Sequence, residues 1–196
     1  MDKKILVSMI LVGLVAALAG AGLYAYFSDT EKSTGNTFTA GTLNLKVGDQ
    51  DPTTWKITVS NMYPGQTGST SVVVANTGSL NGKLSISFSS LVDDENGITE
   101  PESELSDDET SGELAENLKL EIFIDENGNG MYDSGTDVLI YSGTCDGITS
   151  GGLTGYSLDA GVSKTMVVKY AIDSSVGNII QSDKAGFDIT FSLVQA

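Results

Sequence analysis

Gly186-Phe187-Asp188-Ile189-Thr190-Phe191-Ser192-Leu193-Val194 is the segment that decides the fold class, because its apolar and polar side chains alternate. Alternation with a period of two residues is typical of a half-buried β-strand. Further segments have the same strand character, and they are residues 43–47, 57–59, 70–75, 83–91, 117–125, 138–143 and 163–173. Turn-forming pairs such as Pro64-Gly65 and Asn81-Gly82 separate them. We therefore expect an all-β domain, folded as a jelly-roll or immunoglobulin-like β-sandwich.

The first 25 residues predict an export signal. Lys3 and Lys4 precede residues 5–25, which contain no charged side chain, and small residues occupy 19–22. A positive start, an apolar core and small residues at its end are typical of a secretory signal peptide, so we expect an N-terminal apolar signal helix. A stretch of this length can also span a bilayer, which leaves a retained anchor as the alternative. Either way we expect the protein outside the cytoplasm, secreted or at the cell surface, and touching a membrane only through this segment.

The composition excludes several classes of function. The chain has 26 acidic and 10 basic residues and a net charge of −16. Such a charge repels nucleic acid and attracts cations, so we expect no nucleic-acid partner. The chain has no His, which removes most zinc chemistry and Ser-His-Asp catalysis. The single Cys145 cannot form an intrachain disulfide, and it is either a surface thiol or a small buried residue. We expect no enzyme.

One acidic segment interrupts the strand pattern. Residues 93–113 hold ten carboxylates and no Lys or Arg. A segment of this composition buries little apolar surface, so we expect a surface insertion over residues 93–116, with a short helix near 111–118. A solvated loop is the simplest interpretation, and cation binding or subunit contact is the alternative. The rest of residues 41–196 is long enough for one β-sandwich domain.

Residues 125–137 predict a calcium site. Oxygen-bearing side chains alternate before Gly130 and carboxylates follow it, a spacing that can wrap a hard cation. The expected ligands are Asp125, Asn127, Asn129, the backbone carbonyl of Met131, Asp133 and Asp137. An EF-hand loop would have Glu at the position of Thr136 and helices on both sides, and this segment has neither. The competing interpretation is a hairpin turn between two strands, which Asn-Gly favours.

Three parts of the chain resemble one known family. The junction Gly20-Ala21-Gly22-Leu23-Tyr24-Ala25-Tyr26-Phe27-Ser28-Asp29-Thr30-Glu31, followed by Asn36-Thr37-Phe38-Thr39-Ala40-Gly41-Thr42-Leu43-Asn44-Leu45, strongly resembles the N-terminal region of the TasA and camelysin (CalY) family and its archaeal relatives. Met62-Tyr63-Pro64-Gly65 with residues 74–78 resembles the second block of the family. Residues 177–183 and 187–191 resemble its C-terminal strand.

The resemblance implies a jelly-roll protein that is cut by a SipW-type signal peptidase between Ala25 and Tyr26. It also implies a homopolymer, an extracellular pilus or biofilm-matrix fibre as in archaeal bundling pili. In such fibres the freed N-terminal segment of one copy becomes a strand of the next, which satisfies an open sheet edge. Residues 26–40 would be this donor strand, with Tyr26, Phe27 and Phe38 as anchors. Repetition of the contact gives a filament.

Two other functions compete with the filament. One is a monomeric calcium-binding surface protein, either secreted or held by its signal segment. The other is a metalloprotease, as the camelysin name implies, and the absence of His argues against it.

Overall fold

The computed structural model of the chain describes residues 3–4, 41–48, 54–105 and 110–196. Apart from residues 3–4, the expected signal helix lies outside these ranges, and so do the donor segment 26–40 and the residues Ala25, Tyr26, Phe27 and Phe38. Among the residues described, no helix is long and apolar enough to cross a membrane. Gly41–Ala196 forms one compact unit.

Within the described residues the fold has nine strands. They are β1 (Leu45–Val47), β2 (Thr54–Ser60), β3 (Thr67–Asn76), β4 (Gly82–Asp94), β5 (Leu118–Asp125), β6 (Val138–Thr144), β7 (Gly152–Leu158), β8 (Ser163–Ile172) and β9 (Lys184–Gln195). Short helices connect some of them: α2 (Glu100–Ser103), α3 (Leu114–Asn117), η1 (Cys145–Ser150) and η2 (Asn178–Ile180).

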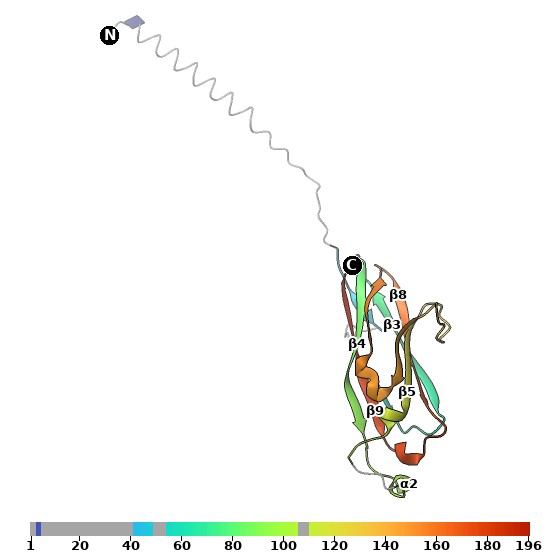
Figure 1. Cartoon of the computed structure of the whole chain (residues 1–196). Coiled ribbons are helices and arrows are strands. Elements are labelled where there is room, and N and C mark those ends of the chain that lie inside the picture. Colours follow the sequence, from blue (N-terminus) through green and yellow to red (C-terminus); the bar gives the residue numbers. More distant parts are fainter. Residues whose placement is uncertain (1–2, 5–40, 49–53, 106–109) are drawn as a thin grey trace. The chain divides into compact units, whose positions relative to one another are not determined.

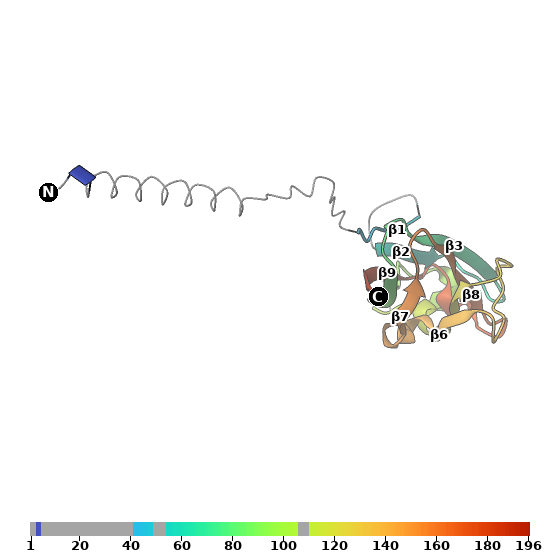
Figure 2. The same cartoon turned by 90° about the horizontal axis from the view of Figure 1, so that it is seen from above.

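The strands form two antiparallel sheets that face each other. One sheet has the order β1-β3-β8-β5-β6 and the other the order β2-β9-β4-β7. Without β1 these are the two four-stranded sheets of a jelly roll. Figure 2, which looks down the sandwich, shows β1, β2 and β3 along one side and β6 and β7 along the other. The prediction of an all-β jelly-roll sandwich is confirmed.

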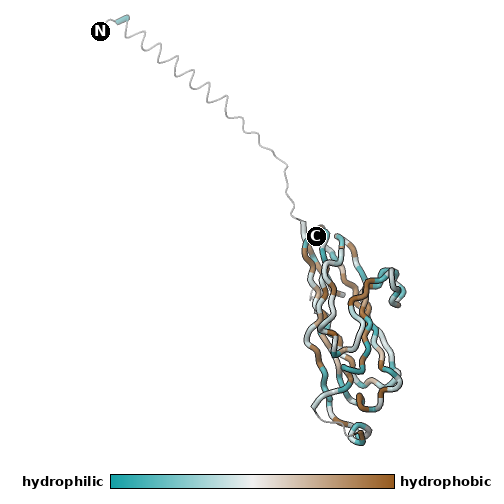
Figure 3. Tube along the Cα trace, viewed as in Figure 1, coloured by the Kyte–Doolittle hydropathy of each residue, from teal (hydrophilic) through white to brown (hydrophobic). Residues whose placement is uncertain are grey.

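The core lies between the sheets, where the alternation seen in the sequence places it. In β9, Phe187, Ile189 and Phe191 are at most 1% exposed, while Ser192 is exposed. Figure 3 shows the same change between apolar and polar positions along the strands. The two faces of β9 therefore differ because side chains alternate along a strand.

β7 is the strand that the sequence did not predict. Leu84 pairs with Tyr156 and Ile86 with Leu153, so β7 carries one extra residue at this point. Gly155 adopts a φ of 73° there, which is typical of a β-bulge. The bulge interrupts the period of two, and the apolar pattern of the strand is lost.

The acidic segment is held against the domain more closely than its composition predicted. β4 extends through Asp94, so the first two residues of the expected insertion belong to a strand. Glu95 is 5% exposed and Glu102 is fully buried. The helix expected near 111–118 is present as α3, and its Leu114 and Ala115 are fully buried.

Candidate functional site

One side of the sandwich has an open edge. Gly48, at a φ of 63°, turns the chain away after the three residues of β1. Its N–H donates to the carbonyl of Val73 at 2.8 Å, which shows that odd-numbered residues of β3 direct their backbone groups to this side. No strand of the described chain pairs with residues 67–72 of β3 here. The outward N–H and C=O groups belong to Thr67, Ser69 and Ser71.

A groove of about 420 Å³ lies beside this edge, between the two sheets. β2, the edge strand of the other sheet, lines one wall from Trp55 to Ser60, and Thr70 and Tyr170 line the opposite wall. Met62 and Gln66, in the connection between β2 and β3, close one end. Trp55 and Tyr170 pack against the core without being fully buried. We call this hollow the β2–β3 groove.

The opposite side of the sandwich is sealed. η1 connects β6 to β7 and crosses between the two sheets. Its Cys145 and Ile148 are fully buried in the core. Burial raises the pKa of the Cys145 thiol to about 12, so of the two interpretations of this residue the structure selects the inert, buried one. Among the described residues, η1 covers the core at β6 and β7, whereas the β2–β3 groove is left between the sheets at β2 and β3.

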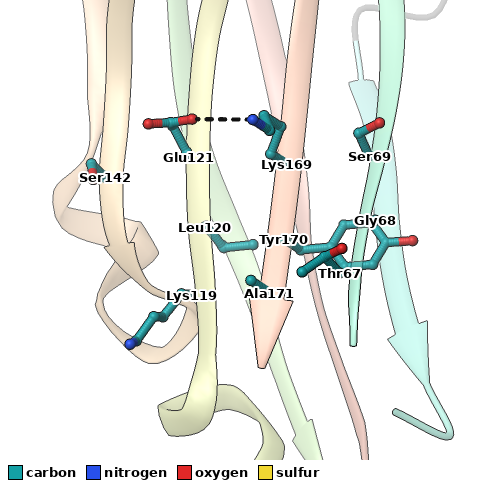
Figure 4. Close-up of a pocket in the computed structure, with 10 residues that line it drawn as sticks. All are labelled: Thr67, Gly68, Ser69, Lys119, Leu120, Glu121, Ser142, Lys169, Tyr170 and Ala171. Atoms are coloured by element: carbon teal, nitrogen blue, oxygen red, sulfur yellow. Dashed lines mark ion pairs between the residues drawn. The ribbon is translucent and has the colours of Figure 1, made fainter. Parts of the chain in front are cut away.

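In the wall opposite β2, Tyr170 pairs across the strands with Gly68. Figure 4 shows its ring lying across Gly68. A Cβ atom on Gly68 would lie 2.4 Å from this ring, so only glycine leaves room for it. The neighbouring Lys169 points to the other face of the sheet, where it pairs with Glu121 at 3.9 Å.

A second apolar pocket of about 530 Å³ adjoins the groove at its closed end, and Met62 lines both. Tyr63, 63% exposed, stands at its rim. The other lining residues are Asn61, Thr99, Gln181 and Ser182. We call it the end pocket. An exposed aromatic ring beside apolar space can receive another aromatic ring.

The predicted calcium loop folds around its own oxygen atoms. Asp125 and Asp137 are 6% and 8% exposed. Each accepts two backbone N–H groups at 2.7 to 2.9 Å, from Gly128 and Gly130 and from Glu126 and Asp133 respectively. These bonds bring both ends of the loop together at its base.

The middle of the loop converges on Asp133. The side-chain amides of Asn127 and Asn129 donate to its Oδ2 at 2.7 and 2.6 Å, and they hold the pKa of Asp133 below its usual value. The Oδ1 of Asn129 accepts the N–H of Met131. The carboxylates of Asp125, Asp133 and Asp137 do not form a metal-ligating group within 4.8 Å of one another in the described chain. The calcium site stays a prediction.

Glu126 ties the base of this loop to both sheets. It accepts hydrogen bonds from the hydroxyl of Tyr156 in β7 and from the Nζ of Lys164 in β8. Lys164 and Tyr156 together lower the pKa of Glu126. Burial and the bond to Glu126 raise the pKa of Tyr156. The loop also covers the outer face of β5, where Tyr132 lies 5.6 Å from Phe123 between ring centroids.

A cluster of carboxylates near the end pocket joins two residues of the acidic segment to one residue outside it. Glu95, Glu102 and Asp183 each bring an oxygen within 4.8 Å of the others, and they are 5%, 0% and 0% exposed. Asp183 accepts the N–H groups of Glu113 and Leu114. Carboxylate oxygens brought this close together could bind a divalent ion. Glu95 and Glu102 belong to the acidic segment, for which cation binding was an alternative. Asp183 is distant in sequence, so no local pattern predicted that it joins them.

Comparison with known proteins identifies the family. Residues 1–142 match the family model described as camelysin metallo-endopeptidase, which is more than half of the chain. The chain belongs to the TasA/camelysin family. The match extends through β1–β5 and the 125–137 loop into β6. No curated protein matches the chain.

Two solved structures resemble this chain only weakly. A crystal structure of a Sulfurospirillum deleyianum protein is 17% identical, covers 72% of this chain and 98% of that one, and has a TM-score of 0.28. AvmM, which catalyses macrocyclization in alchivemycin A biosynthesis, is 16% identical, covers 72% and 75% of the two chains, and has a TM-score of 0.29. TM-scores this low carry no argument.

The camelysin description names a metallo-endopeptidase, and this chain lacks the residue that most often builds such a site. Zinc peptidases bind their metal through His, and the chain has none. Of the features above, the sequence pointed to the 125–137 loop and, through the family resemblance, to assembly. It gave no signal for the β2–β3 groove, because the walls come from strands in different sheets.

Proposed function

We propose that this chain is a secreted structural subunit that polymerises into an extracellular filament, a pilus or biofilm-matrix fibre. Residues 26–40 of one copy act as a strand that completes the next copy at its β2–β3 groove. The observation that carries the proposal is the edge of β3 at residues 67–72, which has no partner strand among the described residues and lies beside the β2–β3 groove. On the opposite side η1 seals the core.

The groove offers two kinds of stabilisation to such a strand. The outward backbone groups of residues 67–72 can pair with it, and each hydrogen bond contributes about 1 kcal/mol net. Burial of one aromatic side chain beside Trp55 or in the end pocket contributes about 2 kcal/mol more. Because donor and acceptor are different surfaces of the same chain, the contact repeats without closing and produces a filament.

Processing would control assembly. Cleavage between Ala25 and Tyr26 by a SipW-type signal peptidase frees the donor segment. Before cleavage the segment is tethered to the membrane. This role requires no catalytic site, and the absence of His agrees with a protein that is not an enzyme.

The test is a deletion of residues 26–40 in the full chain, co-expressed with a SipW-type signal peptidase and examined by electron microscopy. We expect filaments from the parent chain and only monomers from the deletion. Filaments of normal appearance from the deletion variant would disprove strand donation.

A point variant tests the acceptor edge. Ser71→Pro removes an N–H that faces the open side and leaves the pairing of β3 with β8 in place. We expect Ser71→Pro to abolish filaments while circular dichroism shows a folded domain, and Ser71→Ala to assemble normally. Normal assembly of both variants would show that the edge of β3 is not used.

Calcium binding at residues 125–137 is a second proposed property. It is favoured by the convergence of Asn127 and Asn129 on Asp133 between two buried carboxylates. Calcium in the extracellular medium would replace these hydrogen bonds with coordination by the same oxygens. Isothermal titration should show calcium binding that Asp125→Ala with Asp133→Ala removes. Equal heats from both proteins would rule the site out.

A further inference from the structure

The chain enters and leaves the domain at the same end. Gly41 lies against Leu80, since a Cβ on Gly41 would be 2.4 Å from that side chain. The N–H of Ala196 donates to the carbonyl of Asn81 at 3.1 Å. The end pocket lies at the opposite end, beside α2 and η2, which contact each other. Figure 1 shows the C-terminus and α2 at these two extremes. Gly41, the first described residue after the donor segment, therefore lies at the end far from the end pocket.

We infer that the donated strand enters the next copy at the end pocket, with Phe38 seated there, and runs antiparallel to β3. This inference rests on the proposed filament. Copies in a head-to-tail filament have the same polarity, so a segment that leaves one copy at the Gly41 end meets the opposite end of the next. The C-terminal residues of the donated segment then lie at the end of the groove beside the end pocket, and the N-terminus of the segment points toward β1 of the acceptor.

This direction selects the edge that accepts the strand. β3 runs from the β2–β3 connection toward Asn76, whereas β2 runs the opposite way. A strand with the inferred direction is antiparallel to β3 and parallel to β2. Every pairing between two named strands of the described chain is antiparallel, and β1 already pairs with β3 in this direction at residues 74–76. The donated strand would continue the line of β1 along β3, from which Gly48 turns away.

The end pocket fits Phe38 in chemistry and in distance. Met62 forms its apolar wall, and the ring of Tyr63 is free to pack against another ring. Two residues lie between Phe38 and Gly41. The three steps from one Cα to the next span about 10 Å when the chain is extended. Successive domains must then nearly touch end to end. Residues 26–37 are then left to pair along β3 from the end pocket toward β1. This segment is longer than the open stretch of β3 at residues 67–72.

Engineered disulfides between neighbouring copies test the direction of the donated strand. The chain's own Cys145 is fully buried, and burial raises the pKa of its thiol, so we expect only the added thiols to form disulfides. Thr39→Cys with Gln181→Cys places one thiol beside Phe38 and one at the end pocket. The matched control, Thr39→Cys with Thr54→Cys, uses an exposed residue at the far end of β2 instead. Both pairs are made in the full chain, co-expressed with the peptidase, and the filaments are oxidised.

We expect a ladder of covalent multimers on a non-reducing gel for Thr39 with Gln181, and none for Thr39 with Thr54. Filaments that give the ladder only with Thr54, or with neither partner, overturn the direction and leave the filament itself standing. Absence of filaments from the parent chain would instead remove the proposed function on which the inference rests.

The seating of Phe38 in the end pocket is tested separately, through the critical concentration for assembly. Phe38→Ala should raise the critical concentration for assembly by about 30-fold, the factor that loss of one buried aromatic ring implies. Thr37→Ala, on the opposite face of the strand, should leave it unchanged. An equal effect of the two substitutions would contradict the seating of Phe38 in the pocket.

Discussion

Burial of Ile148 on the sealed side of the sandwich predicts how much stability an Ile148→Ala substitution removes. This side chain is fully buried in η1, where it closes the core between β6 and β7. Ile148→Ala removes three carbon atoms from a site that the surrounding strands cannot collapse to fill. Substitutions of this kind cost 2–5 kcal/mol, and we expect about 3.5 kcal/mol here. Since each kcal/mol lowers Tm by about 2–4 °C in a domain of this size, Tm should fall by about 7–14 °C.

Urea denaturation of the monomer measures this cost, with the fluorescence of Trp55, the single tryptophan, as the signal. The slope of unfolding free energy against urea should not change, because the same surface is exposed on unfolding. Val73→Ala is the matched control on the open side, where Val73 is 46% exposed, and it should cost no more than about 0.5 kcal/mol. A cost below about 1 kcal/mol for Ile148→Ala would refute the closed side and with it the asymmetry between the two sides.

Three further predictions concern single features. Lys164→Met removes the main cause of the lowered pKa of Glu126. A lowered pKa stabilises the folded state at pH values above the unfolded pKa of about 4.3, and this stabilisation is lost as pH falls through the folded pKa. The variant should therefore be about 0.5–1 kcal/mol less stable than the parent at pH 7 and nearly equal at pH 3 by urea denaturation, and a difference independent of pH would contradict this. Gly48→Ala should lower the free energy of unfolding by about 1–2 kcal/mol, because Gly48 has a φ of 63°. Gly177→Ala is the control and should leave stability unchanged, since Gly177 has a φ of −75° and open space around it. Equal losses from the two substitutions would show that the backbone conformation of Gly48 does not end β1. Cys145 should react with a thiol reagent only after unfolding, and fast labelling of the native protein would mean that η1 opens.

The sequence by itself determined the fold class and the chemistry that is absent. Alternating positions such as Phe187, Ile189 and Phe191 are local, and a period of two places them on one face of a strand whatever that strand pairs with. The absence of His is a property of composition, which no fold can change. The family resemblance carried the expectation of assembly, and the family match bears out the family alone.

Only the tertiary structure decided where a strand could be received. The groove exists because β1 stops at Gly48 and because Trp55 and Tyr170, from opposite sheets, are left with space between them. The carboxylates of Glu102 and Asp183 meet because η2 returns to α2. Contacts of this kind join residues distant in the chain, and their positions follow from how the sheets pair and pack rather than from any local pattern of residues.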